Sequence, residues 1–193
     1  MTFSYKFMNQ NTLRSISACG RAKAFCCHLG ARFSYACIKN EGPSTTLKVS
    51  KVSLAEFSAL NGQSVSYAVL EYLAGTTNLP HIHPRASELL FVVEGTLQVG
   101  FVDTTNKLFT QTLQTGDIFV FPKGLVHFQY NADAQIPVVA IAAFGSANAG
   151  TVSIPNTLFT TGIDAVVLAK SFKTNTTTIE ALKAGLAPPT PRG

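Results

Sequence analysis

The chain has 193 residues, and 46 % hydrophobic against 13 % charged residues favours one folded domain with buried β-sheets over a solvated helical protein. Its net charge of +5 comes from the beginning of the chain: residues 1–40 hold six basic and no acidic residues, whereas the rest holds nine basic and ten acidic ones. A folded part that is not basic argues against nucleic-acid binding, and no apolar run approaches the roughly 20 residues of a membrane-spanning helix.

Residues 1–44 form an atypical basic leader that we expect to be disordered. They lack the uninterrupted apolar core of a secretory signal, and their composition fits either an organellar transit peptide or an incorrect first exon, of which we favour the second. All four cysteines lie here: Cys19, Cys26, Cys27 and Cys37. Their spacing matches no standard zinc finger, so unpaired thiols are the simplest interpretation.

Residues 45–155 show the pattern of a β-protein. Short runs rich in Val, Ile, Phe and Tyr recur about every ten residues, separated by Gly, Asn and Asp, which predicts a sandwich or barrel of antiparallel strands. The expected strands cover residues 47–54, 64–73, 89–93, 96–102, 107–114, 116–121, 125–131 and 136–144. The run from Leu89 to Val93 is apolar on both faces, so we expect that strand to have no water on either side.

Residues 156–193 change to a helical period. Apolar residues recur at helical intervals in residues 162–172 and 176–186, which predicts two short helices that must pack on another surface to be stable. The Pro-rich end, residues 188–193, is expected to fray. Asn175 begins the sequence Asn-Thr-Thr, a glycosylation signal that matters only in a secreted protein.

Three histidines and a glutamate are spaced as metal ligands. In a strand, His81 and His83 point to the same face, while the flanking prolines place the pair at a strand end or bend and the next strand returns Glu88 toward them. His127 alternates with apolar neighbours, so it shares a face with Gln129 and Asn131. A lone histidine such as His127 is more often structural, but the paired histidines followed by a glutamate are harder to explain without a metal.

The glycines around these residues extend the pattern, which resembles that of the germin and germin-like proteins of the cupin superfamily. The first motif of that family is matched by Gly75, His81, His83, Glu88 and Gly95, and the second by Gly116, Pro122, Gly124, His127 and Asn131. The likeness extends from about residue 45 to residue 186. It implies an all-β cupin jelly-roll barrel at 45–155 and a C-terminal helical segment at 156–193 that joins subunits into a homohexamer, a trimer of dimers.

The metal itself is not decided by the residues alone. Imidazole suits zinc, copper, iron or nickel, and an added carboxylate shifts preference toward a harder ion such as manganese. The family resemblance implies manganese on His81, His83, Glu88 and His127, with no catalytic residue distinct from these ligands. It also implies secretion to the plant cell wall, the apoplast, although the chain shows no recognisable signal peptide.

The resemblance leaves several functions open. The first is a manganese superoxide dismutase that produces hydrogen peroxide in stress or defence, with superoxide or a small carboxylate as substrate. The alternatives are a non-enzymatic auxin-binding or receptor-like protein, with Phe119 and Phe121 at an apolar mouth, or a structural cell-wall protein. Asn78 matches an asparagine that lines the site of oxalate-oxidising germins, but Ala68 stands where a second one is needed, so oxalate oxidase is disfavoured.

Two further interpretations concern residues around the motifs. We expect Gly95, Gly116 and Gly124 to be turn glycines with positive φ rather than site residues. Arg85 is expected to be a surface charge.

Overall fold

The computed structural model describes residues 47–187, and these are mostly β-strand with helices near the end. The interpretations of the basic leader, of its four cysteines and of the tail at 188–193 fall outside these residues. Between the first two strands lies a short 3-10 helix, η1 (Ser58–Leu60), where a loop was predicted.

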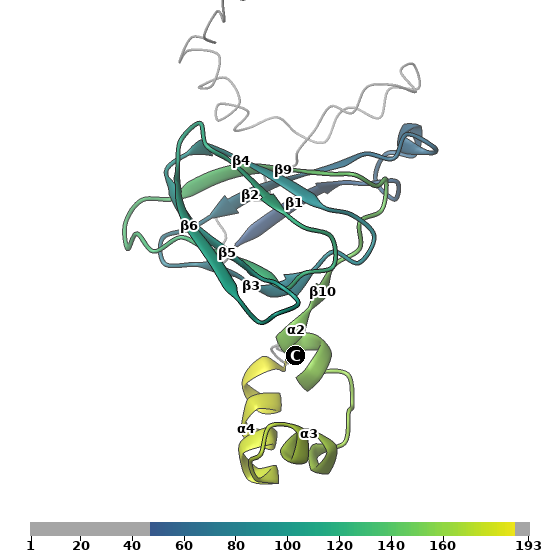
Figure 1. Ribbon diagram of the computed structural model, residues 1–193, viewed down its shortest axis with the longest axis vertical. Helices are drawn as coiled ribbons and strands as arrows, with labels where there is room; N and C mark the ends of the chain where they lie inside the picture. Colours follow the sequence, from purple (N-terminus) through teal and green to yellow (C-terminus); the bar gives the residue numbers. More distant parts are fainter. Residues whose placement is uncertain (1–46, 188–193) are drawn as a thin grey trace, which may run out of the picture. The chain divides into compact units, whose positions relative to one another are not determined.

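The strands form two antiparallel sheets that face each other (Figure 1). The first sheet has the order β1 (Lys48–Val52), β2 (Ser66–Tyr72), β9 (Val138–Phe144), β4 (Glu88–Glu94) and β7 (Ile118–Phe121). The second has the order β10 (Val152–Ser153), β3 (Thr77–Ile82), β8 (His127–Tyr130), β5 (Thr96–Val102) and β6 (Leu108–Gln114). Most neighbouring strands, such as β2 and β9 or β3 and β8, are far apart in sequence, although β1/β2 and β5/β6 are consecutive. The predicted jelly roll is therefore confirmed.

The core lies between the two sheets and is supplied by alternate residues of the strands. Its buried members are Ala68, Leu70, Tyr72, Leu90, Val92, Leu97, Val99, Leu113, Phe121, Val138, Ala140 and Ala142. Since successive side chains of a strand point to opposite faces, each sheet contributes only its inner face to this core.

The outer face of the first sheet is apolar as well, and this corrects the expectation for residues 89–93. Leu89 and Phe91 are 44 % and 39 % exposed, because they point away from the second sheet. Phe91 pairs with Ile118 of β7 and with Ile141 of β9, so the apolar side chains continue across neighbouring strands. The strand is therefore shielded from water on one face only within the described chain.

Three helices follow the barrel strands: α2 (Ile154–Phe159), α3 (Ala165–Ser171) and α4 (Thr176–Leu186). The last two were predicted, whereas α2, which has a proline in its first turn, was not. Leu168, Ala169 and Ile179 form a small hydrophobic cluster of their own, separate from the core between the sheets. No helix within residues 47–187 is long and apolar enough to cross a membrane.

The side chains of Asp164 and Asn175 begin α3 and α4. Each carboxylate or amide oxygen accepts a hydrogen bond from a backbone N–H of the first turn, at 2.6 Å from Val166 and 2.8 Å from Thr178. These bonds satisfy donors that have no partner within the helix. The cap at Asn175 uses the side-chain oxygen rather than the nitrogen.

Candidate metal centre

The three histidines come from the neighbouring strands β3 and β8 of the second sheet and from the residue that follows β3. His81 of β3 is paired with His127, the first residue of β8, and paired residues point to the same face, which brings the ring centroids to 4.1 Å. His83 follows the end of β3, and its ring lies 5.0 Å from that of His81. The register of β3 shifts between Asn78 and His81, where Pro80 stands, as the proline argument predicted.

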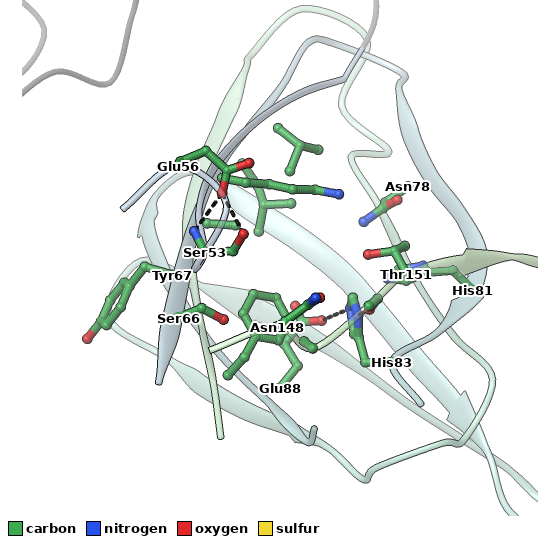
Figure 2. Close-up of a pocket in the computed structure, with 17 residues that line it drawn as sticks. Ser53, Glu56, Ser66, Tyr67, Asn78, His81, His83, Glu88, Asn148 and Thr151 are labelled. Atoms are coloured by element: carbon green, nitrogen blue, oxygen red, sulfur yellow. Dashed lines mark hydrogen bonds and ion pairs between the residues drawn. The ribbon is translucent and has the colours of Figure 1, made fainter. Parts of the chain in front are cut away.

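Glu88 arrives from the opposite sheet as the first residue of β4, and only 2 % of it is exposed. Its Oε2 atom lies 3.0 Å from Nε2 of His83 and 3.3 Å from Nε2 of His127. Figure 2 shows His83 and Glu88 facing each other at the cavity. One ligand atom from each of the four predicted residues lies within 4.8 Å of all the others, so the structure brings the whole set together.

Backbone carbonyls fix the orientation of all three imidazole rings. Nδ1 of His81 lies 2.7 Å from the oxygen of Leu79, Nδ1 of His83 lies 2.5 Å from that of Gly150, and Nδ1 of His127 lies 2.8 Å from that of Leu125. A carbonyl can only accept, so each Nδ1 carries the hydrogen. The neutral ring then presents an Nε2 lone pair to the centre, as in a metal-binding histidine.

This arrangement is unfavourable unless a positive charge lies among the ligands. With a neutral imidazole, Nε2 of His83 would be a second acceptor 3.0 Å from a carboxylate oxygen, so this contact needs a proton or a cation between the two atoms. Nε2 of His127 is fully buried and makes no hydrogen bond. A divalent cation bound by three nitrogens and one carboxylate oxygen satisfies all four groups at once, so the donor set fits a metal.

The electrostatics of the centre favour deprotonated ligands. Burial, with a smaller effect of the neighbouring His127, lowers the pKa of His81 to about 4. Burial by itself raises the pKa of Glu88, but hydrogen bonds donated by His127 and His83 in their protonated form, together with their charge, outweigh it and hold that pKa at about 2. At neutral pH the site therefore has an uncharged His81 and an ionised Glu88, the forms that bind a metal.

Gln129 links this centre to the surrounding strands, a role that the sequence reasoning missed. Its Nε2 donates to Oε1 of Glu88 at 3.2 Å, while its Oε1 accepts from Asn78 at 2.7 Å and from the Tyr72 hydroxyl at 3.3 Å. Burial and the charge of Glu88 raise the pKa of Tyr72 well above its ordinary value, so the phenol keeps its proton. The alternation that placed Gln129 on the face of His127 was the available signal.

Arg85 is exposed, as expected, but it also anchors the loop that holds His83. Its Nε donates to the backbone oxygen of Asn148 at 2.6 Å, and its Nη2 donates to the Asn148 side chain at 2.7 Å. Gly150, two residues later, supplies the carbonyl that accepts from His83. The interpretation of Arg85 as only a surface charge is therefore incomplete.

The second motif contributes turns and links as well as a ligand. The N–H of Gly124 donates to the backbone oxygen of His83 at 3.1 Å, which ties the two motifs together directly. Gly95, Gly116 and Gly124 have φ of 94°, 96° and 74°, so the prediction of turn glycines is confirmed. Asn131 is structural: its amide nitrogen donates to the carbonyls of Leu73 and Ile136 at 3.0 and 2.8 Å.

Comparison with known proteins identifies the family. The model of the Cupin family matches residues 38–180. Germin-like protein 9-3 of Oryza sativa subsp. japonica is 63 % identical over 147 residues, which are 76 % of this chain and 68 % of that protein. The chain belongs to the germin-like proteins of the cupin family. Germin-like protein subfamily 2 member 4 of Arabidopsis thaliana is 45 % identical over 142 residues, 72 % of this chain and 64 % of that protein.

Solved structures of oxalate oxidase have a fold similar to that of this germin-like chain. An oxalate oxidase structure superimposes with a TM-score of 0.73 at 33 % identity, covering 89 % of this chain and 85 % of that chain. A structure of oxalate oxidase in complex with the substrate analogue glycolate matches with the same TM-score at 32 % identity.

A cavity of about 420 Å³ opens beside the candidate metal ligands of this germin-like chain. Asn78 and Thr151 lie on the side of His81 in Figure 2, and Ser53 and Glu56 lie across the cavity from them. The expected aromatic mouth is wrong, because neither Phe119 nor Phe121 lines this cavity. Phe121 is fully buried and stacks on His127 with ring centroids 4.6 Å apart. It therefore packs against the imidazole ring of a candidate ligand rather than lining the cavity.

Proposed function

We propose that this chain is a manganese-binding germin-like protein that acts as a superoxide dismutase and so produces hydrogen peroxide in plant stress or defence. The observation that carries the proposal is the convergence of three imidazole Nε2 atoms and one carboxylate beside an open cavity. A bound manganese ion would supply one-electron exchange with superoxide. Dismutation turns two superoxide anions and two protons into oxygen and hydrogen peroxide, so it needs no other reductant.

The residues of the chain have distinct roles in this proposal. His81, His83, Glu88 and His127 hold the ion, and the carboxylate favours manganese over the softer metals that imidazole alone would accept. Gln129 orients Glu88 through its hydrogen bond at 3.2 Å. We assign Asn78 to the substrate side, because it lines the cavity while its amide is held by Gln129.

Oxidation of oxalate is disfavoured despite the likeness to oxalate oxidase structures. Ala68 is 3 % exposed and lines the cavity, so the wall offers a methyl group where a second amide donor is needed. A lost hydrogen bond to a charged substrate costs about 1.5–3 kcal/mol, which lowers the rate by about tenfold or more.

We also propose secretion to the apoplast, glycosylation at Asn175 and assembly into a homohexamer. Asn175 is exposed and uses its side-chain oxygen for the helix cap, which is compatible with a glycan on its nitrogen. The exposed apolar side chains on the outer face of the first sheet and on α3 support assembly, since such faces are stable when another subunit covers them.

Superoxide consumption by the manganese-loaded full chain tests the proposal. We expect activity per bound manganese to exceed that of free Mn²⁺, and Glu88→Gln to lower manganese affinity by at least about tenfold, because even groups that only contact a ligand are worth about 10–100-fold. Glu94→Gln, at the exposed end of the same strand, is the matched control and should bind manganese normally.

Each arm of this experiment can fail separately. Activity no greater than that of free Mn²⁺ would remove the dismutase function. Unchanged manganese affinity in Glu88→Gln, measured by elemental analysis after dialysis against a series of metal concentrations, would remove the ligand assignment.

A further inference from the structure

An exposed turn between η1 and β2 contains an asparagine followed by a glycine. Asn61 and Gly62 form this pair, and no other asparagine of the sequence precedes a glycine. Asn61 has φ −59° and ψ 122°, and Gly62 has φ +74°, which are the values of a type II turn. The N–H of Gln63 closes the turn on the backbone oxygen of Leu60 at 3.0 Å. Residues 61–65 are all exposed, so water reaches the turn freely.

The two groups that can react with each other in this turn are both free. The side-chain amide of Asn61 has no hydrogen-bond partner among residues 47–187, and the N–H of Gly62 donates to no group there. A Cβ added at Gly62 would meet no atom within 4 Å, so the turn has room to move. Rotation about ψ of Asn61 can therefore bring the Gly62 nitrogen to Cγ of the Asn61 side chain.

The side chain of Gln63 contacts the peptide unit that would react. Its Nε2 donates to the backbone oxygen of Asn61 at 3.3 Å, and that oxygen belongs to the same peptide unit as the Gly62 nitrogen. Because the C–N bond has partial double-bond character, a hydrogen bond to the oxygen draws electron density away from the nitrogen. The N–H of Gly62 thereby loses its proton more readily, and the deprotonated nitrogen is the nucleophile that attacks an asparagine amide.

Three other asparagines of the described chain lack this combination. Asn106 is exposed too, but the N–H of the next residue, Lys107, donates to Oδ1 of Asp103 at 2.9 Å. Asn131 is fully buried, and its amide nitrogen donates to backbone carbonyls. The amide oxygen of Asn175 accepts from the first turn of α4 at 2.8 Å. The turn before β2 differs from these sites in having a free amide beside a free N–H.

We propose that Asn61 is a site of spontaneous deamidation and isomerisation. The deprotonated Gly62 nitrogen attacks Cγ of Asn61, a new C–N bond forms, and the side-chain nitrogen takes up a proton and leaves as ammonia. Water then opens the cyclic imide. Cleavage between the nitrogen and Cγ gives aspartate, and cleavage between the nitrogen and the backbone carbonyl carbon gives isoaspartate. Water is the only co-reactant that the sequence of steps requires.

The products change a segment that is connected to the cavity wall. Both place a negative charge in the turn, since a carboxyl group of this kind has a pKa of about 4. Isoaspartate also adds a carbon atom to the backbone, so the path from η1 to β2 lengthens. Ser53 and Glu56, before η1, and Ser66, which begins β2, line the cavity. The modification therefore reaches the ends of the segment without involving a candidate metal ligand, and the inference does not depend on the proposed function.

Peptide mapping by mass spectrometry of the full chain tests this inference. Folded protein and protein unfolded in guanidinium chloride are incubated at mildly alkaline pH, and each asparagine is followed by the mass difference between an amide and an acid. We expect the acid to accumulate first at residue 61, at similar rates in the two samples, because the fold leaves this turn free. Methyl transfer from S-adenosylmethionine by an isoaspartyl carboxyl methyltransferase measures the isoaspartate fraction.

Variants assign the reaction to the pair of residues. Asn61→Gln should lose the acidic species from this turn, because its longer side chain would have to close a larger ring. Gly62→Ala should slow the reaction, since a Cβ crowds the attacking nitrogen, and Gln63→Ala should slow it to a smaller extent. Asn106→Gln is the matched control and should deamidate at residue 61 as the wild type does. Thermal unfolding shows that each variant keeps the fold.

An amide that survives at residue 61 in the folded protein while the unfolded chain loses it would overturn the inference, since the fold would then protect the turn. Equal rates in the wild type and in Gly62→Ala would overturn it as well. Manganese content, measured on the same samples, reports separately on the proposed function. A chain that deamidates at residue 61 but holds no manganese contradicts only the metal assignment.

Discussion

The tautomer of each candidate ligand histidine is set by the backbone carbonyl that its Nδ1 contacts. The carbonyls of Leu79, Gly150 and Leu125 each accept a hydrogen bond from an Nδ1, so in the neutral ring each Nε2 is left free for a cation. The candidate metal centre is therefore preorganised for a cation. A bound cation would satisfy the Nε2 atoms and the Glu88 carboxylate together, and metal binding should raise stability by mass action.

The metal-free protein should lose stability as the pH falls from 7 to 4. The pKa of His81 is about 4 in the fold against 6.5 in the unfolded chain, so between these values the unfolded state binds a proton that the folded state does not. Stability contributed by neutral His81 is present above pH 6.5 and is lost by pH 4, which amounts to about 3 kcal/mol. Glu88 adds a loss at lower pH, between 4.5 and about 2.

Urea unfolding across this pH range measures the effect. The variant His81→Gln, which cannot titrate at this position, should show a shallower slope between pH 6.5 and 4 than the wild type does. Equal slopes in the two proteins would contradict the assignment to His81.

At the scale of elements, the site depends on loops and strand ends rather than on strand interiors. His83 lies beyond β3, Glu88 begins β4, and the loop before β10 supplies the carbonyl of Gly150. Arg85 holds that loop through Asn148, so a residue that contacts no candidate ligand determines where one ligand points. Ligands on strand ends can thus be positioned by loops from elsewhere in the chain.

Gly150→Ala should disturb the centre without touching a ligand. Gly150 has φ +72°, where a side chain costs about 1–2 kcal/mol, and an added Cβ would lie 2.6 Å from Nη2 of Arg85. We expect lower stability in thermal or urea unfolding and weaker manganese binding, because the carbonyl that orients His83 shifts. Gly145→Ala in the same loop region is the control, since its Cβ meets no atom within 4 Å. Similar losses in both variants would show that the loop tolerates neither and that the contact with Arg85 is irrelevant.

At the scale of the molecule, two apolar surfaces remain uncovered in the single described chain. Ile118 and Val120 of β7 are 60 % and 53 % exposed and adjoin Leu89 and Phe91 of β4. On α3, Val166 and Val167 are 51 % and 55 % exposed although the helix is too short to be stable alone. These are the surfaces that the proposed assembly would cover.

Charged substitutions on these surfaces should reduce the size of the assembly. We expect the wild type to sediment as a hexamer, Ile118→Lys to break contacts through the sheet, and Val167→Glu to break contacts through the helices, each giving smaller species in analytical ultracentrifugation. Thr112→Lys, on an exposed position of β6, should sediment as the wild type does. A monomeric wild type would contradict the proposed assembly, and unchanged variants would contradict these surfaces as its contacts.

The strands were predictable because alternation and turn residues are local signals. β5 and α4 have the predicted bounds, and β6 and β9 begin within two residues of theirs. The strand of the first histidine pair was predicted only as a strand end, because its bulge depends on pairing with β8. The exposure of Leu89 and Phe91 could not be predicted, since apolar residues on both faces of a strand do not say what covers each face.

The sequence by itself determined the four candidate ligands, their spacing and the all-β fold. It could do so because the spacing of the candidate ligands and the alternation of strand residues are both local patterns. What only the tertiary structure decided is how those residues are held, through the carbonyl that each Nδ1 contacts and the hydrogen bond from Gln129 to Glu88. These relations join segments from different strands and loops. Distances between such segments arise from sheet pairing and packing, and no local pattern in the sequence contains them.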